Sequence, residues 1–180
     1  MSDEKNSTRK RPLVALLVII AILICFCGIF IGIFNVVGIT KVYGISMEPS
    51  LQGGQYVIFD KLSTGKLNRG DIIVIGINQE EYLIKRLIGL PGDTIEIRDG
   101  QVILNNEPFA EPYLTENTSG IYGPQTVAPG HFFVLGDNRG SSNDSRTLGS
   151  IPGEYISGRV TGTLPSWLAK YIPGSASDEW

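Results

Sequence analysis

The chain has 180 residues, of which 15 Lys+Arg and 18 Asp+Glu make 18% charged, fewer than an ordinary soluble domain carries. All of these charges lie outside Leu13–Phe34, a run of 22 residues without one charged side chain. The part after this run has 11 basic and 16 acidic residues, a balance that argues against nucleic acid as a partner. The segment after Lys41 is long enough for one folded domain and short for two.

The uncharged run predicts a transmembrane helix. At about 1.5 Å per residue its helical length is roughly 33 Å, enough to cross a hydrocarbon core of about 30 Å. Basic residues 9–11 precede the run, whereas only Lys41 follows it closely, so the N-terminus should stay in the cytoplasm. The run is longer than the core of a removable signal peptide, about 7 to 15 residues, and no Ala-x-Ala-like site follows it. We therefore expect three parts: a cytoplasmic basic tail (1–12), a membrane anchor (13–37) and an extracytoplasmic domain (38–180).

Cysteine and histidine are too scarce for the usual zinc sites. Cys25 and Cys27 both lie in the uncharged run, two positions apart, where helical side chains do not face each other. His131 is the sole histidine, and no cysteine lies outside the run. We therefore expect neither a disulfide framework nor a bound metal.

Beyond Lys41, short runs rich in Val, Ile, Phe and Tyr alternate with Gly, Pro, Asn and Asp. These runs are typical of strands. The predicted strands are Tyr56–Phe59, Ile72–Ile77, Tyr82–Leu90, Thr94–Arg98, Gln101–Leu104 and Phe132–Leu135. Asp99-Gly100 tolerates positive φ and predicts a type I′ hairpin between two of them. With no long segment of helical periodicity here, we expect a mainly β fold, one compact antiparallel domain after a single N-terminal transmembrane helix.

Two side chains could carry a reaction. Ser46 lies in Gly-Ile-Ser-Met-Glu-Pro, where a turn can expose the hydroxyl, although most such serines are simply turn residues. Lys85 lies in a predicted strand, on the same face as Leu83 and Leu87. If that face is buried, desolvation lowers the lysine pKa from about 10.4, and the neutral amine can take a proton from a serine hydroxyl. A lysine that reaches water from a sheet edge is the commoner arrangement.

A third segment, from Gly136 to Arg146, is a polar loop after a predicted strand. It carries two carboxylates, two arginines and several hydroxyl and amide groups that could form the wall of an active site. A solvated loop has the same composition, so the segment alone does not decide between the two interpretations.

Together these segments resemble the bacterial type I signal peptidases in their Gram-positive form, membrane-anchored Ser-Lys endopeptidases that remove signal peptides from exported preproteins. Ser46-Met-Glu-Pro49 matches the nucleophile motif Ser-Met-x-Pro, and Lys85-Arg-Leu-Ile-Gly-Leu-Pro-Gly-Asp93 matches the motif that holds the base. Gly136–Arg146 matches Gly-Asp-Asn-Arg-x-x-Ser-x-Asp-Ser-Arg, and Arg69-Gly-Asp71 before Ile-Ile-Val resembles a further conserved box.

The resemblance implies a β domain of the signal-peptidase type, with Ser46 as nucleophile, Lys85 as general base and no cofactor. Ser142 would orient Lys85 by a hydrogen bond, while Asp144 and Arg146 would brace the loop. The backbone N–H of Ser46 would stabilise the oxyanion together with a second donor that the sequence does not identify. The implied partners are signal-peptide-bearing preproteins and the lipid bilayer.

Three other interpretations remain open. His131 could serve as the base of a Ser-His-Asp site. The chain could instead be a membrane-tethered, non-catalytic β module for binding or adhesion, with Arg69-Gly-Asp71 as the adhesive tripeptide. Self-cleaving bacterial repressors also share a Ser-Lys β domain, but they carry a DNA-binding part where this chain has its uncharged run.

Overall fold

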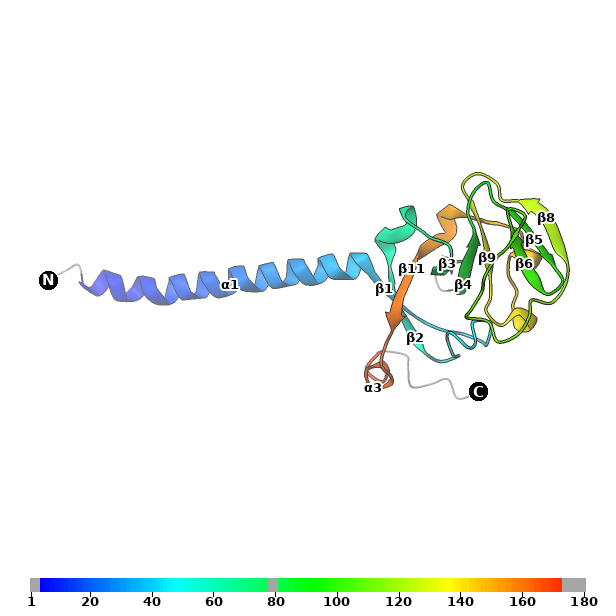
Figure 1. The fold of residues 1–180 in the computed structure, drawn as a ribbon. Coiled ribbons are helices and arrows are strands. Elements are labelled where there is room, and N and C mark those ends of the chain that lie inside the picture. Colours follow the sequence, from blue (N-terminus) through cyan, green and yellow to red (C-terminus); the bar gives the residue numbers. More distant parts are fainter. Residues whose placement is uncertain (1–3, 78–80, 173–180) are drawn as a thin grey trace. The chain divides into compact units, whose positions relative to one another are not determined.

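The chain divides into two compact units, Met1–Val37 and Gly38–Trp180, in a computed structural model that describes residues 4–77 and 81–172 (Figure 1). The first unit is helix α1 (Glu4–Val36), which contains the whole uncharged run. Over the described residues, no helix reaches the length and hydropathy required to cross a membrane. Of the predicted anchor, residues 13–37, all but Val37 lie in helix α1.

The second unit consists of two antiparallel sheets, which confirms the predicted mainly β fold. In spatial order the larger sheet is β1 (Val37–Lys41), β2 (Tyr56–Asp60), β11 (Ile156–Thr163), β3 (Ile72–Gly76), β4 (Tyr82–Gly89), β9 (His131–Leu135) and β10 (Ile151–Pro152). The smaller sheet is β7 (Glu107–Pro108), β6 (Gln101–Leu104), β5 (Thr94–Arg98) and β8 (Tyr122–Thr126). Short helices lie between strands: η1 (Lys61–Gly65), η2 (Arg139–Ser141), α2 (Ser145–Leu148), η3 (Gly153–Tyr155) and α3 (Ser166–Ala169).

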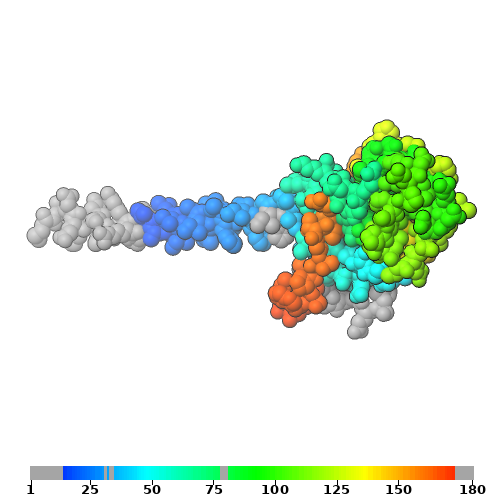
Figure 2. Space-filling view, in the orientation of Figure 1, coloured from blue at the N-terminus to red at the C-terminus, as the bar shows by residue number. Residues whose placement is uncertain are grey.

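The six predicted strands are confirmed, two of them with identical bounds. Asp99 and Gly100 both have positive φ, 51° and 79°, and join β5 to β6 in the predicted hairpin. The sequence did not predict β11, because Ile-Ser-Gly-Arg-Val-Thr-Gly-Thr lacks an alternating apolar pattern. β11 is nevertheless central in the larger sheet, where it pairs with both β2 and β3 and interrupts each register once. In Figure 2 it lies, in orange, beside the cyan part of the chain that contains β2.

β4 contributes to all three hydrophobic clusters of this unit. Leu83 and Leu87 pack into one cluster, with Ile73 and Ile75 of β3. Ile84 packs into another, formed around the loop after β1, and Ile88 joins a third with the smaller sheet. This alternation is the period of two expected for a strand that is buried on both faces. It leaves Lys85 and Arg86 as buried charged side chains in the middle of β4.

Candidate active site

Ser46 lies in the loop between β1 and β2, and its neighbours fix this loop to the core. Gly44 adopts φ 72°, a conformation that favours glycine and turns the chain before the serine. Met47 is 1% exposed and packs with buried Leu51 in the cluster that contains Ile84. The Leu51 N–H also donates to the Met47 carbonyl at 2.9 Å. The loop is therefore anchored on one side of Ser46, whose own side chain is only partly buried.

Lys85 is the partner of this serine. It lies opposite Ile73 in the β3–β4 register and is 3% exposed. Its Nζ donates a hydrogen bond to Ser46 Oγ at 2.6 Å. Burial lowers the pKa of Lys85 below the ordinary lysine value, although the carboxylates of Asp144 and Asp137 oppose this effect. The amine is thus more readily neutral than that of an exposed lysine.

The polar loop after β9 supports the main chain at Ser46. The Asn138 N–H donates to the Ser46 carbonyl at 3.0 Å. A Cβ atom on Gly136 would lie 2.5 Å from this same carbonyl oxygen and would also collide with Ser142 Oγ. Only glycine therefore fits position 136, and the two loops meet backbone to backbone.

Asp144 and Arg146 form an ion pair inside this loop, with Arg146 Nε 2.9 Å from Asp144 Oδ1. Asp144 is fully buried and also accepts the Gly136 N–H at 2.9 Å. Burial alone would raise the pKa of Asp144, but the bonds from Arg146 and the Gly136 N–H outweigh it and lower that pKa. Arg146 also donates to the Arg139 carbonyl at 2.7 Å. The pair thus links both ends of the loop.

Ser142 does not make the hydrogen bond to Lys85 that the resemblance implies. Its Oγ is buried, and among the described residues it is the one buried side-chain oxygen or nitrogen without a hydrogen-bond partner. It lies against Gly136, at the side of the loop that faces Ser46. Its role toward Lys85 remains a prediction.

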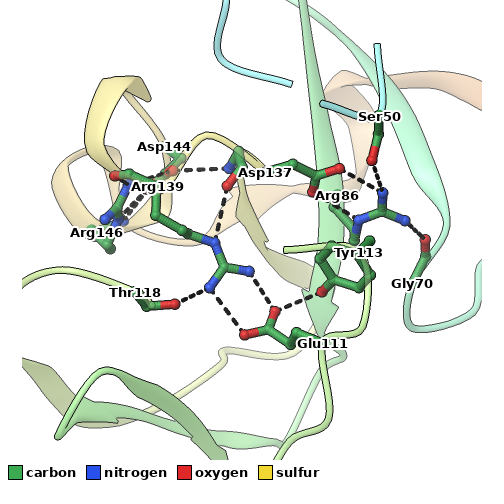
Figure 3. A network of polar contacts seen from close by, with 11 residues as sticks. Ser50, Gly70, Arg86, Glu111, Tyr113, Thr118, Asp137, Arg139, Asp144 and Arg146 are labelled. Atoms are coloured by element: carbon green, nitrogen blue, oxygen red, sulfur yellow. Dashed lines mark hydrogen bonds and ion pairs between the residues drawn. The ribbon is translucent and has the colours of Figure 1, made fainter. Parts of the chain in front are cut away.

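Three residues of the site carried no sequence signal. Glu111, Tyr113 and Thr118 lie between β7 and β8, outside every matched motif, and their contacts run to the arginines of two motifs (Figure 3). Arg86, next to Lys85, binds Asp137 through Nε at 2.8 Å and Nη2 at 2.6 Å.

The residues of the rival interpretations are engaged elsewhere. The His131 ring lies 3.0 Å from the Pro129 carbonyl, and no hydrogen bond within the described part of the chain joins it to Ser46. Arg69 makes a bidentate ion pair with Asp93, and the Gly70 carbonyl accepts a bond from Arg86. The tripeptide is therefore tied into the domain. No cluster of three or more His, Cys, Asp or Glu among the residues described could hold a metal ion.

A family model described as signal peptidase, peptidase S26, matches residues 13–166. The chain belongs to this family. Signal peptidase I of Bacillus licheniformis is 35% identical over 175 residues, which cover 88% of this chain and 91% of that protein. Signal peptidase IB of Staphylococcus aureus is 33% identical over 164 residues, covering 79% and 85%. The crystal structure of a signal peptidase I from Enterococcus faecalis is 35% identical, with a TM-score of 0.48, and covers 53% of this chain and 97% of that one.

Membership of the signal peptidase family confirms the predicted enzyme class, a serine endopeptidase that cleaves signal peptides. It also favours this class over the non-catalytic binding module.

Proposed function

We propose that Ser46 and Lys85 are the nucleophile and general base with which this chain, anchored in the cell membrane, removes signal peptides from exported preproteins. The observation that carries the proposal is the 2.6 Å contact between Lys85 Nζ and Ser46 Oγ at a lysine that is 3% exposed. A serine hydroxyl needs a neutral base within hydrogen-bond reach, and burial is what makes a lysine neutral.

The first step joins Ser46 to the substrate. Neutral Lys85 accepts the hydroxyl proton while Oγ forms a bond to the scissile carbonyl carbon, and the carbonyl electron pair moves onto its oxygen. Among the described residues, the Ser46 N–H donates no hydrogen bond to another backbone group. It is therefore available to the resulting oxyanion. Asn138 and Gly136 hold the other end of this residue, the carbonyl, in place.

The second step releases the two products. The oxyanion collapses, the peptide C–N bond breaks and the leaving amine takes the proton from Lys85, which leaves an acyl-enzyme on Ser46. Water then gives a proton to Lys85 and attacks the ester, and the same base returns a proton to Ser46. These steps require no cofactor.

The edge of β4 opposite to β3 offers a place for the substrate. Tyr82–Ile84 pair with β3, whereas the pairing with β9 begins only at Arg86. Among the described residues no strand pairs with the other edge of the segment before Lys85, and an extended peptide added there would gain main-chain hydrogen bonds beside Ser46. The family resemblance implies small side chains at the first and third positions before the cut.

The anchor part of the proposal rests on the 22 uncharged residues within α1 and on the basic residues before them. It places the N-terminus in the cytoplasm and residues 38–180 on the extracytoplasmic side of a single-pass protein. Ser46 lies twelve positions after Phe34, a span of at most roughly 40 Å. A tether of this length keeps the serine close to the bilayer, where signal peptides also insert, and so raises the effective substrate concentration.

The test uses the purified chain of 180 residues in detergent with a secretory precursor whose cleavage is mapped. Wild type should cut after a small residue, and Ser46→Ala and Lys85→Ala should both abolish the cut. The matched controls are Ser119→Ala and Lys66→Ala, which change exposed residues outside the site and should leave cleavage intact. Undiminished cleavage by Lys85→Ala would exclude the assigned base, and loss in His131→Ala alone would favour the histidine mechanism.

A further inference from the structure

Glu111 and Tyr113 connect the smaller sheet to the active site. They lie in the segment 109–118, whose ends are held to the smaller sheet by two backbone bonds, from the Phe109 N–H to the Val102 carbonyl and from the Thr118 N–H to the Gly100 carbonyl, both at 2.9 Å. Neither residue belongs to a matched motif, and no hydrogen bond or ion pair among the described residues joins either of them to Ser46 or Lys85. Any effect on the chemistry must therefore pass through other side chains.

The Glu111 carboxylate binds Arg139 inside the protein. Arg139 Nη1 donates to one carboxylate oxygen at 3.0 Å, and Nη2 forms an ion pair with the other. The exposed fractions of the two side chains are only 6% for Glu111 and 1% for Arg139. The guanidinium also donates to Thr118 Oγ1. Figure 3 shows Glu111 between Arg139 and Tyr113, whose hydroxyl donates to it at 2.6 Å.

Arg139 in turn fixes the main chain that supports Ser46. Its Nε donates to the Gly136 carbonyl at 3.0 Å, which closes the turn 136–139 upon itself. Within this turn, the Asn138 N–H holds the Ser46 carbonyl, and Gly136 lies in direct contact with that carbonyl. A shift of the Arg139 guanidinium would therefore move the surface on which Ser46 rests.

Tyr113 makes a second connection, to the strand that carries Lys85. The centroid of its ring lies 3.8 Å from Cζ, the guanidinium carbon, of Arg86, the residue after Lys85. The same guanidinium binds Asp137, which lies between Gly136 and Asn138 in the turn. Glu111 thus contacts Arg139, in the turn that supports Ser46, and Tyr113 contacts Arg86, the neighbour of Lys85.

We propose that Glu111, assisted by Tyr113, is a positioning residue that holds Ser46 in place against Lys85 through Arg139. This inference rests on the proposed function and adds to it a requirement from outside the catalytic motifs. Without its carboxylate, Glu111 leaves a buried guanidinium uncompensated, and such a group moves toward water or toward another acceptor. The turn 136–139 moves with it, and displacement of a reacting group by about 1 Å can lower a rate by as much as 10²-fold.

The test compares Glu111→Gln with Glu116→Gln, a matched control in the same segment at an exposed glutamate. Glu111→Gln should lower kcat about tenfold and leave KM within about twofold, because the site that binds substrate is intact while the nucleophile is displaced. Glu116→Gln should match wild type in both constants. Rates are divided by the folded fraction from circular dichroism, so that a loss of stability alone does not change kcat.

A double variant tests the route through Arg139. Glu111→Gln combined with Arg139→Gln should have a kcat no lower than that of the more impaired single variant, because both changes break the same connection. Fully additive losses would overturn the proposed route.

If Glu111→Gln fails to fold, Tyr113→Phe decides, because it keeps the ring over Arg86 and removes one bond to Glu111. It should lower kcat about twofold to fivefold at constant KM, as expected for one hydrogen bond of about 0.5 to 1 kcal/mol. Wild-type kcat in folded Glu111→Gln or Tyr113→Phe would overturn the inference. If Ser46→Ala is inactive in the same assay, that result would leave the proposed function standing; activity in Ser46→Ala would remove both.

Discussion

Replacing Gly136 by alanine tests the contact between the two loops with one methyl group. The added Cβ would lie 2.5 Å from the Ser46 carbonyl oxygen, about 0.9 Å short of the 3.4 Å at which ordinary van der Waals contact begins. It would also lie 2.5 Å from the Cβ of Ser142. Neither the Ser46 carbonyl oxygen nor the Ser142 Cβ is the flexible end of a long side chain. The Ser46 main chain must therefore retreat by most of this distance.

The displacement predicts a larger loss of activity than of stability. Overpacking of this kind costs about 1 to 3 kcal/mol, or roughly 2 to 12 °C in Tm for a chain of this size. A shift of Ser46 Oγ by nearly 1 Å away from Lys85 should lower kcat by about 10- to 100-fold. Both are measured on one preparation, by thermal unfolding followed by circular dichroism and by cleavage of the precursor.

Gly140→Ala is the matched control, because it adds the same methyl group to the same loop where no atom lies within 4 Å. It should keep the cleavage rate of wild type. Equal activity of Gly136→Ala and wild type would refute the claim that this backbone contact sets the position of Ser46. Equal losses in the two variants would show that the loop as a whole is sensitive, and would refute it as well.

Three further predictions concern Lys85, the proposed base, and the loop that carries Ser46, the proposed nucleophile. Burial lowers the pKa of Lys85 in the folded protein below its pKa in the unfolded chain. Lys85 therefore destabilises the folded state most at pH values below the folded-state pKa, and this cost vanishes above the unfolded-state pKa. Lys85→Met should thus be inactive yet more stable than wild type in urea titrations at neutral pH, with the advantage shrinking as the pH approaches about 10.4. Asp144→Asn removes a carboxylate that raises the Lys85 pKa, so the acidic limb of kcat/KM against pH should move to lower pH; a shift upward would contradict the assigned base. Met47→Ala should cost about 2 to 5 kcal/mol in unfolding free energy and lower kcat, because it removes the fully buried anchor of the Ser46 loop; an unchanged urea midpoint would count against that anchor.

Each arginine of the site forms an ion pair with a carboxylate, and these pairs matter for the experiments on Lys85. Arg86 pairs with Asp137, Arg139 with Glu111 and Arg146 with Asp144, and in each pair the carboxylate side chain is at most 6% exposed. Among the described residues, Lys85 is the one buried cation that forms no ion pair with a carboxylate. Its hydrogen bond runs instead to the hydroxyl of Ser46, an arrangement that the proposed role as general base requires.

Much of the local structure is determined by the sequence alone. Six strands and the Asp99-Gly100 turn follow from β-rich runs and from a dipeptide that tolerates positive φ, because backbone sterics act between neighbouring residues. The four motifs likewise identify the family without any coordinates, since each is a fixed spacing along the chain. The roles of Ser46, Lys85 and Asp144 are proposals that the experiments above address, and those of Ser142, Arg146 and the anchor stay predictions.

Tertiary structure decides what lies beside these motifs. Lys85 and Ser46 are 39 positions apart, and their contact depends on a strand register and on a loop fixed by Met47. Glu111 reaches Arg139 across 28 positions without a sequence pattern that marks it. β11, poor in apolar residues, becomes a central strand because β2 and β3 satisfy its backbone on both sides. Steric preferences of a residue extend only to its neighbours, whereas the pairing of distant segments depends on how the whole core packs.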